Sequence, residues 1–298
     1  MGLFTIPDRL QRQDGRHARV DGIPFQLPVN SENSPALMAA FPIDATRAAE
    51  LLPGHEIHPF RLWGNTGLLV VSVINYRTTD IGAYVEFSIG IACTHGRSPA
   101  PMALPLLLPG HYGVGQYVYD LPVSTEVSVK GGKGIWGMPK HQAQLDFLVE
   151  EDTVSSQYDL DGELAMRIDI DRPERVWLPV RMRGINYCQF RGMLMKSVIH
   201  FRGTAGFTLF NDDAARLIIG DHPRMQPLKT LNIQPPLFTG FLPDTHGVLD
   251  DHLESWFISA ETPIEEDVEG FESVGDLGTS EEWPPPPDRD VNYPAPVV

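Results

Sequence analysis

Short apolar segments separated by turn residues fill most of the second half of the chain. Turn signals such as Asp161-Gly162 and Gly203 stand between them. Runs of this length and spacing are typical of β-strands joined by tight turns. The expected strands are residues 143–150, 154–160, 165–170, 176–182, 194–202 and 206–210. Their spacing predicts a curved or closed antiparallel sheet.

The first half of the chain adds two further strands. Residues 67–76 are nearly all apolar, so both faces of this strand are expected to be buried. Residues 83–92 alternate, which puts apolar side chains on one face and a mixed set on the other. The mixed face holds Tyr84, Glu86, Ser88 and Gly90. Glu86 then lies either on the wet face of an edge strand or inside a barrel, and the residues alone favour the edge strand.

Helical patterns are few and short. Residues 44–52 predict a helix with Asp44 as its N-cap. Residues 212–219 predict a second helix, capped by Asn211 and ended by Gly220. Few short helices beside many strands place the chain in the β-rich α+β class.

A glycine-rich segment, residues 131–141, separates the two groups of strands. It reads Gly-Gly-Lys-Gly-Ile-Trp-Gly-Met-Pro-Lys-His, which is a poor helix interior and a poor central strand. We therefore expect a shaped loop, preceded by a short helix over residues 125–130. Lys140 follows the proline directly and is one of only five lysines in the chain. Taken alone, it reads as a solvated lysine after a turn.

The same segment fits the dinucleotide fingerprint G-x-G-x-x-G through Gly132, Gly134 and Gly137. That fingerprint requires a strand before it and a helix that opens within it. Pro139 would fall inside such a helix and remove a hydrogen bond. No series of βαβ units follows, so we reject a dinucleotide site.

The segment resembles the acetoacetate decarboxylase family. In that family a Gly-Arg-Glu-x-x-Gly-x-Pro-Lys-Lys type segment carries the lysine that forms a Schiff base with the substrate ketone, and Lys140 falls on that position. Residues 81–86 are similar to the family strand that ends in its active-site glutamate. Residues 203–210, followed by 221–223 and 227–228, are similar to its late strand and the turn after it.

The resemblance covers roughly residues 30–259 and implies a curved sheet or cone-shaped β-barrel of the acetoacetate decarboxylase type. Residues 1–29 are then a polar N-terminal segment, and residues 260–298 an acidic, proline-rich tail. The tail holds eleven acidic residues against Arg289 alone, so it carries −10 of the net charge of −16. Such a composition predicts an extended, poorly packed segment. The rest of the chain then carries a charge of −6, and we expect its fold to survive truncation after residue 259.

The resemblance implies a Schiff-base lyase, with decarboxylation of a 3-oxo acid as the first hypothesis. Two alternatives stay open: an aldolase or dehydratase-type enzyme that uses the same lysine imine on a 2-oxo or 3-oxo acid, and a ligand-binding barrel without turnover. The implied partner is a small-molecule oxo acid, with no cofactor and no metal, and the family commonly forms homo-oligomers. The implied catalytic residues are Lys140 and Glu86, and the implied substrate-binding or pKa-tuning residues are His141, Trp136, Met138 and Tyr84.

The chemistry requires a neutral lysine, and burial lowers the pKa of an amine. Trp136 and Met138 can supply apolar surroundings for Lys140. The family has a second lysine where this chain has His141, which is mostly neutral at pH 7. We therefore expect burial, with Lys133 as a second contributor, to depress the pKa of Lys140. The other four lysines are expected to stay charged: Lys130, Lys133, Lys196 and Lys229.

Two departures from the family bear on the substrate. The family decarboxylase has an N-terminal arginine on the substrate side, whereas residues 20–46 hold no arginine here. The glutamate of the family's Gly-Arg-Glu segment is Gly134. We therefore expect poor use of acetoacetate relative to a larger or more apolar oxo acid.

The remaining features exclude several function classes. The net charge of −16 argues against nucleic-acid binding. Cys93 and Cys188 give no disulfide framework. His55 and His58 lack a matching second pair and read as surface histidines. No apolar stretch reaches the length of a membrane span, and we expect a soluble, cytoplasmic protein with no membrane partner.

Overall fold

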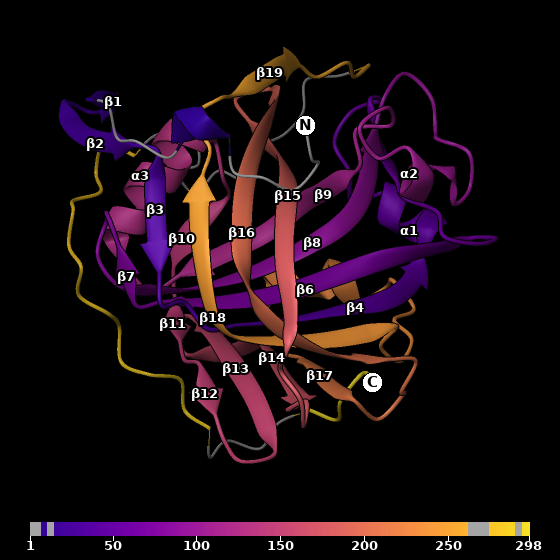
Figure 1. Ribbon diagram of the computed structural model, residues 1–298. Coiled ribbons are helices and arrows are strands. Elements are labelled where there is room, and N and C mark those ends of the chain that lie inside the picture. The colour runs from indigo at the N-terminus through magenta and orange to yellow at the C-terminus, as the bar shows by residue number, and fades with distance from the viewer. Residues whose placement is uncertain (1–6, 11–14, 262–273, 290–293) are drawn as a thin grey trace.

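The computed structural model describes residues 7–10, 15–261, 274–289 and 294–298. Within them, seven long strands close into a barrel, and a smaller sheet packs against its outside (Figure 1). The β-rich α+β prediction, including the barrel, is confirmed. No described helix is long and apolar enough to cross a bilayer.

Hydrogen bonding around the barrel returns to its starting strand. All neighbouring pairs are antiparallel except β15 and β9, which are parallel. The order around the barrel is β16 (Met193–Leu209), β15 (Leu178–Phe190), β9 (Gly115–Val123), β8 (Tyr84–His95), β6 (Thr66–Tyr76), β4 (Ala36–Asp44) and β18 (Phe238–Leu249), which pairs again with β16. Shorter strands extend this sheet: β3 (Val29–Glu32), β5 (Ile57–Pro59), β7 (Thr78–Thr79), β10 (Lys140–Gln142) and β19 (Glu254–Phe257).

The smaller sheet covers the outer face of β4, β6 and β8. Its strands are β11 (Gln144–Leu145), β12 (Leu148–Val149), β13 (Thr153–Leu160), β14 (Glu163–Asp171) and β17 (Ala215–Ile219). Asp161 and Gly162 both have positive φ and form the tight turn between β13 and β14 that the sequence predicted. The main hydrophobic core lies between this sheet and the outer face of the barrel.

Strand β8 shows how one strand serves both the core and the barrel interior. Its odd-numbered residues from Val85 to Ile91 lie in the main core. Tyr84, Glu86 and Ser88 line a cavity inside the barrel. The predicted alternation is therefore correct, and the carboxylate of Glu86 lies in a barrel interior rather than on an edge strand. Strand β6 also has one face in the core and one face toward the cavity. The expectation that both faces are buried is therefore wrong for the cavity face, whose residues are half-buried.

The glycine-rich segment is largely helical, which corrects the prediction of a loop. Helix α3 spans Glu126–Trp136 and ends at Gly137, whose φ of 63° is left-handed. A Cβ on Gly131 would lie 3.0 Å from the Phe25 ring, and one on Gly134 would lie 2.5 Å from Val20. The glycines therefore let neighbouring chain segments approach the helix backbone, and this packing outweighs their low helix propensity. Because they lie late in the helix, they cannot act as a dinucleotide-binding turn.

Residues 212–219 form no helix, contrary to the sequence prediction. Asn211 Oδ1 accepts from the N–H of Asp213 in a turn, and β17 then pairs with β14. Ala215, Leu217 and Ile219 lie in the main core. The partner strand, which no local pattern reveals, overrides the helical propensity of this segment.

The last long strands are longer than predicted. Gly203 is no turn, because β16 runs unbroken from Met193 to Leu209. A Cβ at Gly203 would lie 2.5 Å from the carbonyl oxygen of Asp244 on β18, so glycine permits the close approach of the two strands. Strand β15 likewise continues to Phe190, eight residues past the predicted end at residue 182.

The remaining elements are short. Helix α1 (Ala45–Ala49) begins at the predicted cap, where Asp44 accepts from the N–H groups of Thr46 and Arg47. The β1–β2 hairpin packs on α3. The bounds of the other elements are η1 Asp8–Leu10, β1 Arg16–Val20, β2 Ile23–Leu27, α2 Leu104–Leu107, η2 Pro223–Met225 and α4 Gln226–Lys229.

The C-terminal tail is packed along the body. In Figure 1 its yellow trace passes from the neighbourhood of α3 and β7 down to β12. Buried Lys130 donates from Nζ to the carbonyl oxygens of Val274 and Leu277, at 2.9 and 2.7 Å. Trp283 donates to the carbonyl oxygen of Ala83, and the N–H of Val297 to that of Leu217. The tail is extended as expected, but the prediction of poor packing is wrong for its described residues.

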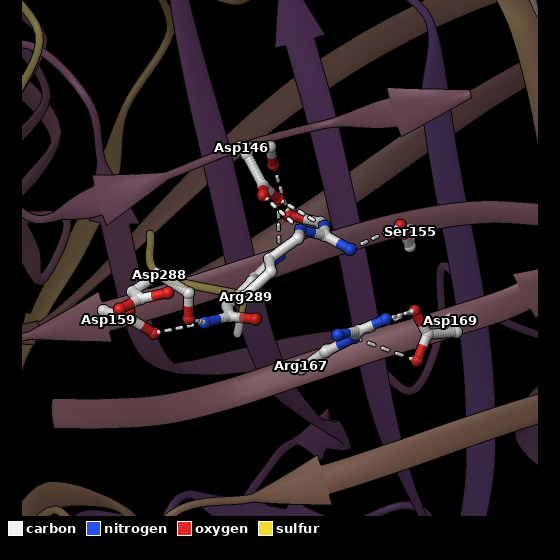
Figure 2. Close-up of polar contacts among 9 residues, drawn as sticks. Asp146, Ser155, Asp159, Arg167, Asp169, Asp288 and Arg289 are labelled. Atoms are coloured by element: carbon white, nitrogen blue, oxygen red, sulfur yellow. Dashed lines mark hydrogen bonds and ion pairs between the residues drawn. The ribbon is translucent and has the colours of Figure 1, made fainter. Parts of the chain in front are cut away.

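Arg289 anchors the tail to the small sheet (Figure 2). Its guanidinium donates to both carboxylate oxygens of Asp146, at 2.6 and 2.7 Å, and to Ser155 Oγ at 3.1 Å. Gln157 of the same sheet donates to the carbonyl oxygen of Asp288. A bidentate pair of this kind is stronger than a single surface contact.

We expect Arg289→Ala to lower the free energy of unfolding by about 1–3 kcal/mol, because it leaves the partly buried Asp146 without its charged partner. Limited proteolysis should also release the tail faster. Lys196→Ala is the control, because it removes an ion pair with Glu254 between β16 and β19 of the barrel sheet. Equal proteolysis of the two variants would contradict the anchor.

Candidate functional site

Lys140 begins β10, which pairs in parallel with the end of β9. Its side chain points into the barrel and is only 4% exposed. Nζ lies 2.7 Å from Glu86 Oε2 and donates to Ser128 Oγ at 3.0 Å. Three elements therefore converge on one amine: β10 carries it, β8 supplies the carboxylate and α3 supplies the hydroxyl.

Gly132 makes room for this side chain. A Cβ at Gly132 would lie 2.4 Å from Cδ of Lys140 and 2.7 Å from its Cε. The aliphatic stem of Lys140 therefore lies directly on the helix backbone. This contact accounts for a glycine in the middle of α3, where it costs helix stability.

The pKa of Lys140 is raised, which contradicts the expected depression. Burial alone lowers it, but the nearby Glu86 carboxylate and the Tyr84 side chain raise it by more. The sequence argument counted desolvation and left out the opposite charge 2.7 Å away. Without a ligand, the site therefore holds an ammonium–carboxylate pair.

Two tyrosines complete the wall around this pair. The Tyr84 ring centroid lies 5.1 Å from Lys140 Nζ, and the Tyr76 ring lies 4.7 Å from the Tyr84 ring. Burial raises the pKa of Tyr84 to about 12 and that of Tyr76 well above its usual range, so both hydroxyls stay protonated near neutral pH. Ser128 and Tyr76 were missed in the sequence. Only the β6–β8 register, which pairs Tyr76 with Tyr84, could have indicated Tyr76.

The cavity has a volume of about 380 Å³ and runs through the barrel interior. Met138 lines it, as the sequence predicted for an apolar neighbour of Lys140. Trp136 is not among the lining residues; it is buried beside Met138 and donates from Nε1 to the carbonyl oxygen of Asp250. Trp136 therefore holds the end of α3 in place.

His141 is not brought together with the Lys140 amine. It does not line the cavity, and its Nε2 lies 2.8 Å from the Tyr158 hydroxyl. That hydroxyl donates to Oδ2 of the buried Asp120 at 3.2 Å, so it accepts from His141 Nε2. Burial lowers the pKa of His141 to about 3 and raises that of Asp120 to about 6, although Arg224 lies 3.4 Å from Asp120. This buried network ties β10 to β9 and β13.

Lys133 is also turned away from the cavity. Burial and the charge of Arg224 lower its pKa to about 8, which corrects the expectation that it stays fully charged. It does not line the cavity and therefore gives no support to activation of Lys140 by direct contact. Among the described residues, no group of three or more His, Cys, Asp or Glu side chains is placed to hold a metal ion.

Sequence comparison matches residues 16–190 to the acetoacetate decarboxylase family, which is more than half of the 298 residues. The chain belongs to the acetoacetate decarboxylase family. No curated protein matches it in sequence.

Solved structures of the acetoacetate decarboxylase type share the fold. An acetoacetate decarboxylase from Legionella pneumophila has a TM-score of 0.53 and 15% identity, over 76% of this chain and 89% of that chain. An acetoacetate decarboxylase-like enzyme from Sphingomonas wittichii has a TM-score of 0.51 and 13% identity, over 78% and 95%. The enduracididine biosynthesis enzyme MppR, solved with the condensation product of pyruvate and imidazole 4-carboxaldehyde, has a TM-score of 0.52 and 13% identity, over 76% and 88%. The acetoacetate decarboxylase fold is therefore found with more than one chemistry.

The ion pair of this family member yields a direct test. In Glu86→Gln the carboxylate is gone while burial remains, so the pKa of Lys140 should fall below the ordinary value for lysine. The pH dependence of Lys140 modification by an amine-reactive reagent, read by peptide mass spectrometry, measures this change. Glu50→Gln, at an exposed position, is the control. An unchanged or higher pKa in Glu86→Gln would show that Glu86 does not set the charge of Lys140.

The buried network predicts a pH dependence of stability. The pKa of His141 is about 3 in the folded state, below its unfolded value, so its neutral form stabilises the protein above about pH 6.5. This contribution is lost as the pH falls toward 3, by on the order of 2 kcal/mol at pH 5. Denaturant unfolding at pH 7 and pH 5 should therefore show a smaller difference for His141→Gln than for the wild type. The exposed His55→Gln should keep the wild-type difference.

Proposed function

We propose that this protein is a Schiff-base lyase that decarboxylates a 3-oxo acid through an imine on Lys140. The observation that carries the proposal is the buried Lys140–Glu86 pair at 2.7 Å, inside a cavity and at the imine position of the family segment. The substrate is an oxo acid of low mass, and the lysine itself supplies the electron sink.

The ion pair sets the first step. An ammonium cannot attack a ketone, so its proton must leave, and Glu86 Oε2 at 2.7 Å is the acceptor. Transfer of this proton from Nζ to the carboxylate of Glu86 leaves a neutral amine beside the incoming ketone.

Imine formation and loss of CO₂ follow. The lone pair of Nζ forms a C–N bond to the ketone carbon, and the carbonyl oxygen takes one proton from Glu86 and a second from Nζ. The C–O bond then breaks, water leaves, and an iminium remains. The bond to the carboxylate then breaks, CO₂ departs, and its electron pair forms the C=C bond of an enamine. A proton delivered to the enamine carbon restores the iminium, and water hydrolyses it to the ketone and the Lys140 ammonium.

An aldolase or dehydratase-type reaction is the second candidate. The same enamine can attack an aldehyde instead of taking a proton, and the structurally similar MppR was solved with a condensation product of pyruvate. Absence of the family's N-terminal arginine from residues 20–46 leaves the substrate class open to this chemistry. A ligand-binding barrel without turnover is the third candidate.

We also propose a homo-oligomer, because the family commonly assembles. The described surface exposes large apolar side chains suited to an interface, among them Trp177, Phe210 and Phe257. Light scattering coupled to size-exclusion chromatography measures the assembly.

The decisive test is trapping of the imine. After incubation with a 3-oxo acid or 2,4-pentanedione, borohydride should fix one label per chain on Lys140. Lys140→Ala should abolish the label. Lys133 is the internal control: with a pKa of about 8 roughly a tenth of it is neutral at pH 7, yet it lies outside the cavity. Labelling of Lys133 at the rate of Lys140 would remove the Schiff-base mechanism.

A CO₂-release screen separates the candidates. Release of CO₂ from a 3-oxo acid, lost in Lys140→Ala, supports the decarboxylase. A trapped adduct without CO₂, together with products from an added aldehyde, supports the aldolase-type enzyme. Binding without an adduct supports the ligand-binding barrel.

A further inference from the structure

We propose that the substrate carries an extended apolar substituent, so that the whole oxo acid has about a dozen non-hydrogen atoms. The inference rests on the function proposed for Lys140 and names the substrate class of that site. It comes from the size, length and lining of the cavity.

The volume exceeds the need of a small oxo acid. A water molecule occupies about 30 Å³ in the liquid, so a cavity of about 380 Å³ holds on the order of a dozen groups of that size. Acetoacetate would leave much of this space unfilled. An oxo acid such as 3-oxooctanoate or 3-oxodecanoate fills it.

Small side chains on the inner wall create the space. Barrels of this size are usually filled by their own side chains. Here Ser72 on β6 and Ser88 on the adjacent strand β8 are paired in register, and both line the cavity. The inner wall is therefore open where a barrel core would hold large residues.

The length of the cavity agrees with its volume. Lys140 pairs with Leu121 near the end of β9, whereas Gln116 lies near the start of the same strand, and all three residues line the cavity. Five residues of strand span about 17 Å. An extended chain advances about 1.2 Å per bond, so this distance is long enough for a chain of about a dozen atoms.

Polarity divides the cavity into a reactive end, an apolar channel and a polar far end, where Arg183 also belongs to the lining. Near Lys140 lie Glu86 and Tyr84, and beside the start of β9 the Gln116 amide donates to Asn186 Oδ1 at 2.9 Å. Apolar residues from several strands line the space as well: Val70, Ile74, Val118, Met182, Ile199 and Phe201. Such a channel favours an alkyl or ring substituent, since each buried methylene strengthens binding about fourfold.

The test begins with a ladder of straight-chain 3-oxo acids, from acetoacetate to 3-oxotetradecanoate. For the wild type, kcat/KM for CO₂ release should rise about fourfold per added methylene and stop rising near 3-oxodecanoate. A highest kcat/KM for acetoacetate would overturn the inference.

Ser88→Leu tests whether the channel sets this profile. The new side chain enters the channel next to the reactive end, two residues from Glu86 on β8, so the ratio of kcat/KM for 3-oxodecanoate to that for acetoacetate should fall at least tenfold. Because the ratio is taken within one variant, partial misfolding does not affect it. Ser255→Leu adds the same side chain at an exposed position of β19 and should keep the wild-type ratio. A wild-type ratio in Ser88→Leu would overturn the inference.

A binding measurement separates this inference from the proposed function. Saturated straight-chain acids have no ketone and form no imine, yet they can occupy the channel. Their stabilisation of the protein in thermal unfolding should peak near decanoate, and Ser88→Leu should move the peak to shorter acids. If this peak is found but no oxo acid is trapped on Lys140, the proposed function fails while the size of the ligand stands. If trapping succeeds but stabilisation does not depend on length, the inference about the substrate fails alone.

Discussion

A charged amine held against a carboxylate inside an apolar barrel is the constraint that organises this structure. Removing both charges from water is costly unless each is paired and hydrogen-bonded. Lys140 meets this requirement through Glu86 at 2.7 Å and Ser128 at 3.0 Å. Glycine at position 132 lets the lysine stem lie on α3, so the amine reaches both partners. The position of Lys140 thus explains Gly132, whereas Gly131 and Gly134 make room for Phe25 and Val20.

The same strands build the core and the cavity, and this sets what can vary. On β8 the outward residues pack against the small sheet, whereas Glu86 and Ser88 face inward. Stability therefore comes mainly from the outer face, where 27 buried residues form the largest cluster. Because that outer core carries the stability, the inner face is free to hold small and polar residues. A cavity inside the barrel then costs the fold little.

Sequence reasoning succeeded where a local pattern carried the information. The alternation of residues 83–92 grouped Glu86 with the residues of β8 that line the cavity, and Asp44 caps α1 as predicted. It failed where a distant partner decides the outcome: β17 is a strand because β14 lies beside it, and α3 is a helix because Phe25 and Val20 pack on its glycines. The raised pKa of Lys140 belongs to the second group, since Glu86 lies far from it in sequence.

The packing of the acidic tail is a second feature that a distant partner decides, here through polar contacts. Its composition offers little apolar surface, which is why the sequence predicted poor packing. The structure holds it instead through backbone carbonyls, which Lys130 and the amides of Gln142, Gln144 and Gln157 bind as donors. Backbone carbonyl acceptors are present in every sequence, so composition cannot reveal whether side-chain donors of the body lie within hydrogen-bond distance of them. Lys130 belongs to α3, the helix on which the stem of Lys140 lies, and the tail is therefore bound to the element that positions the reactive amine.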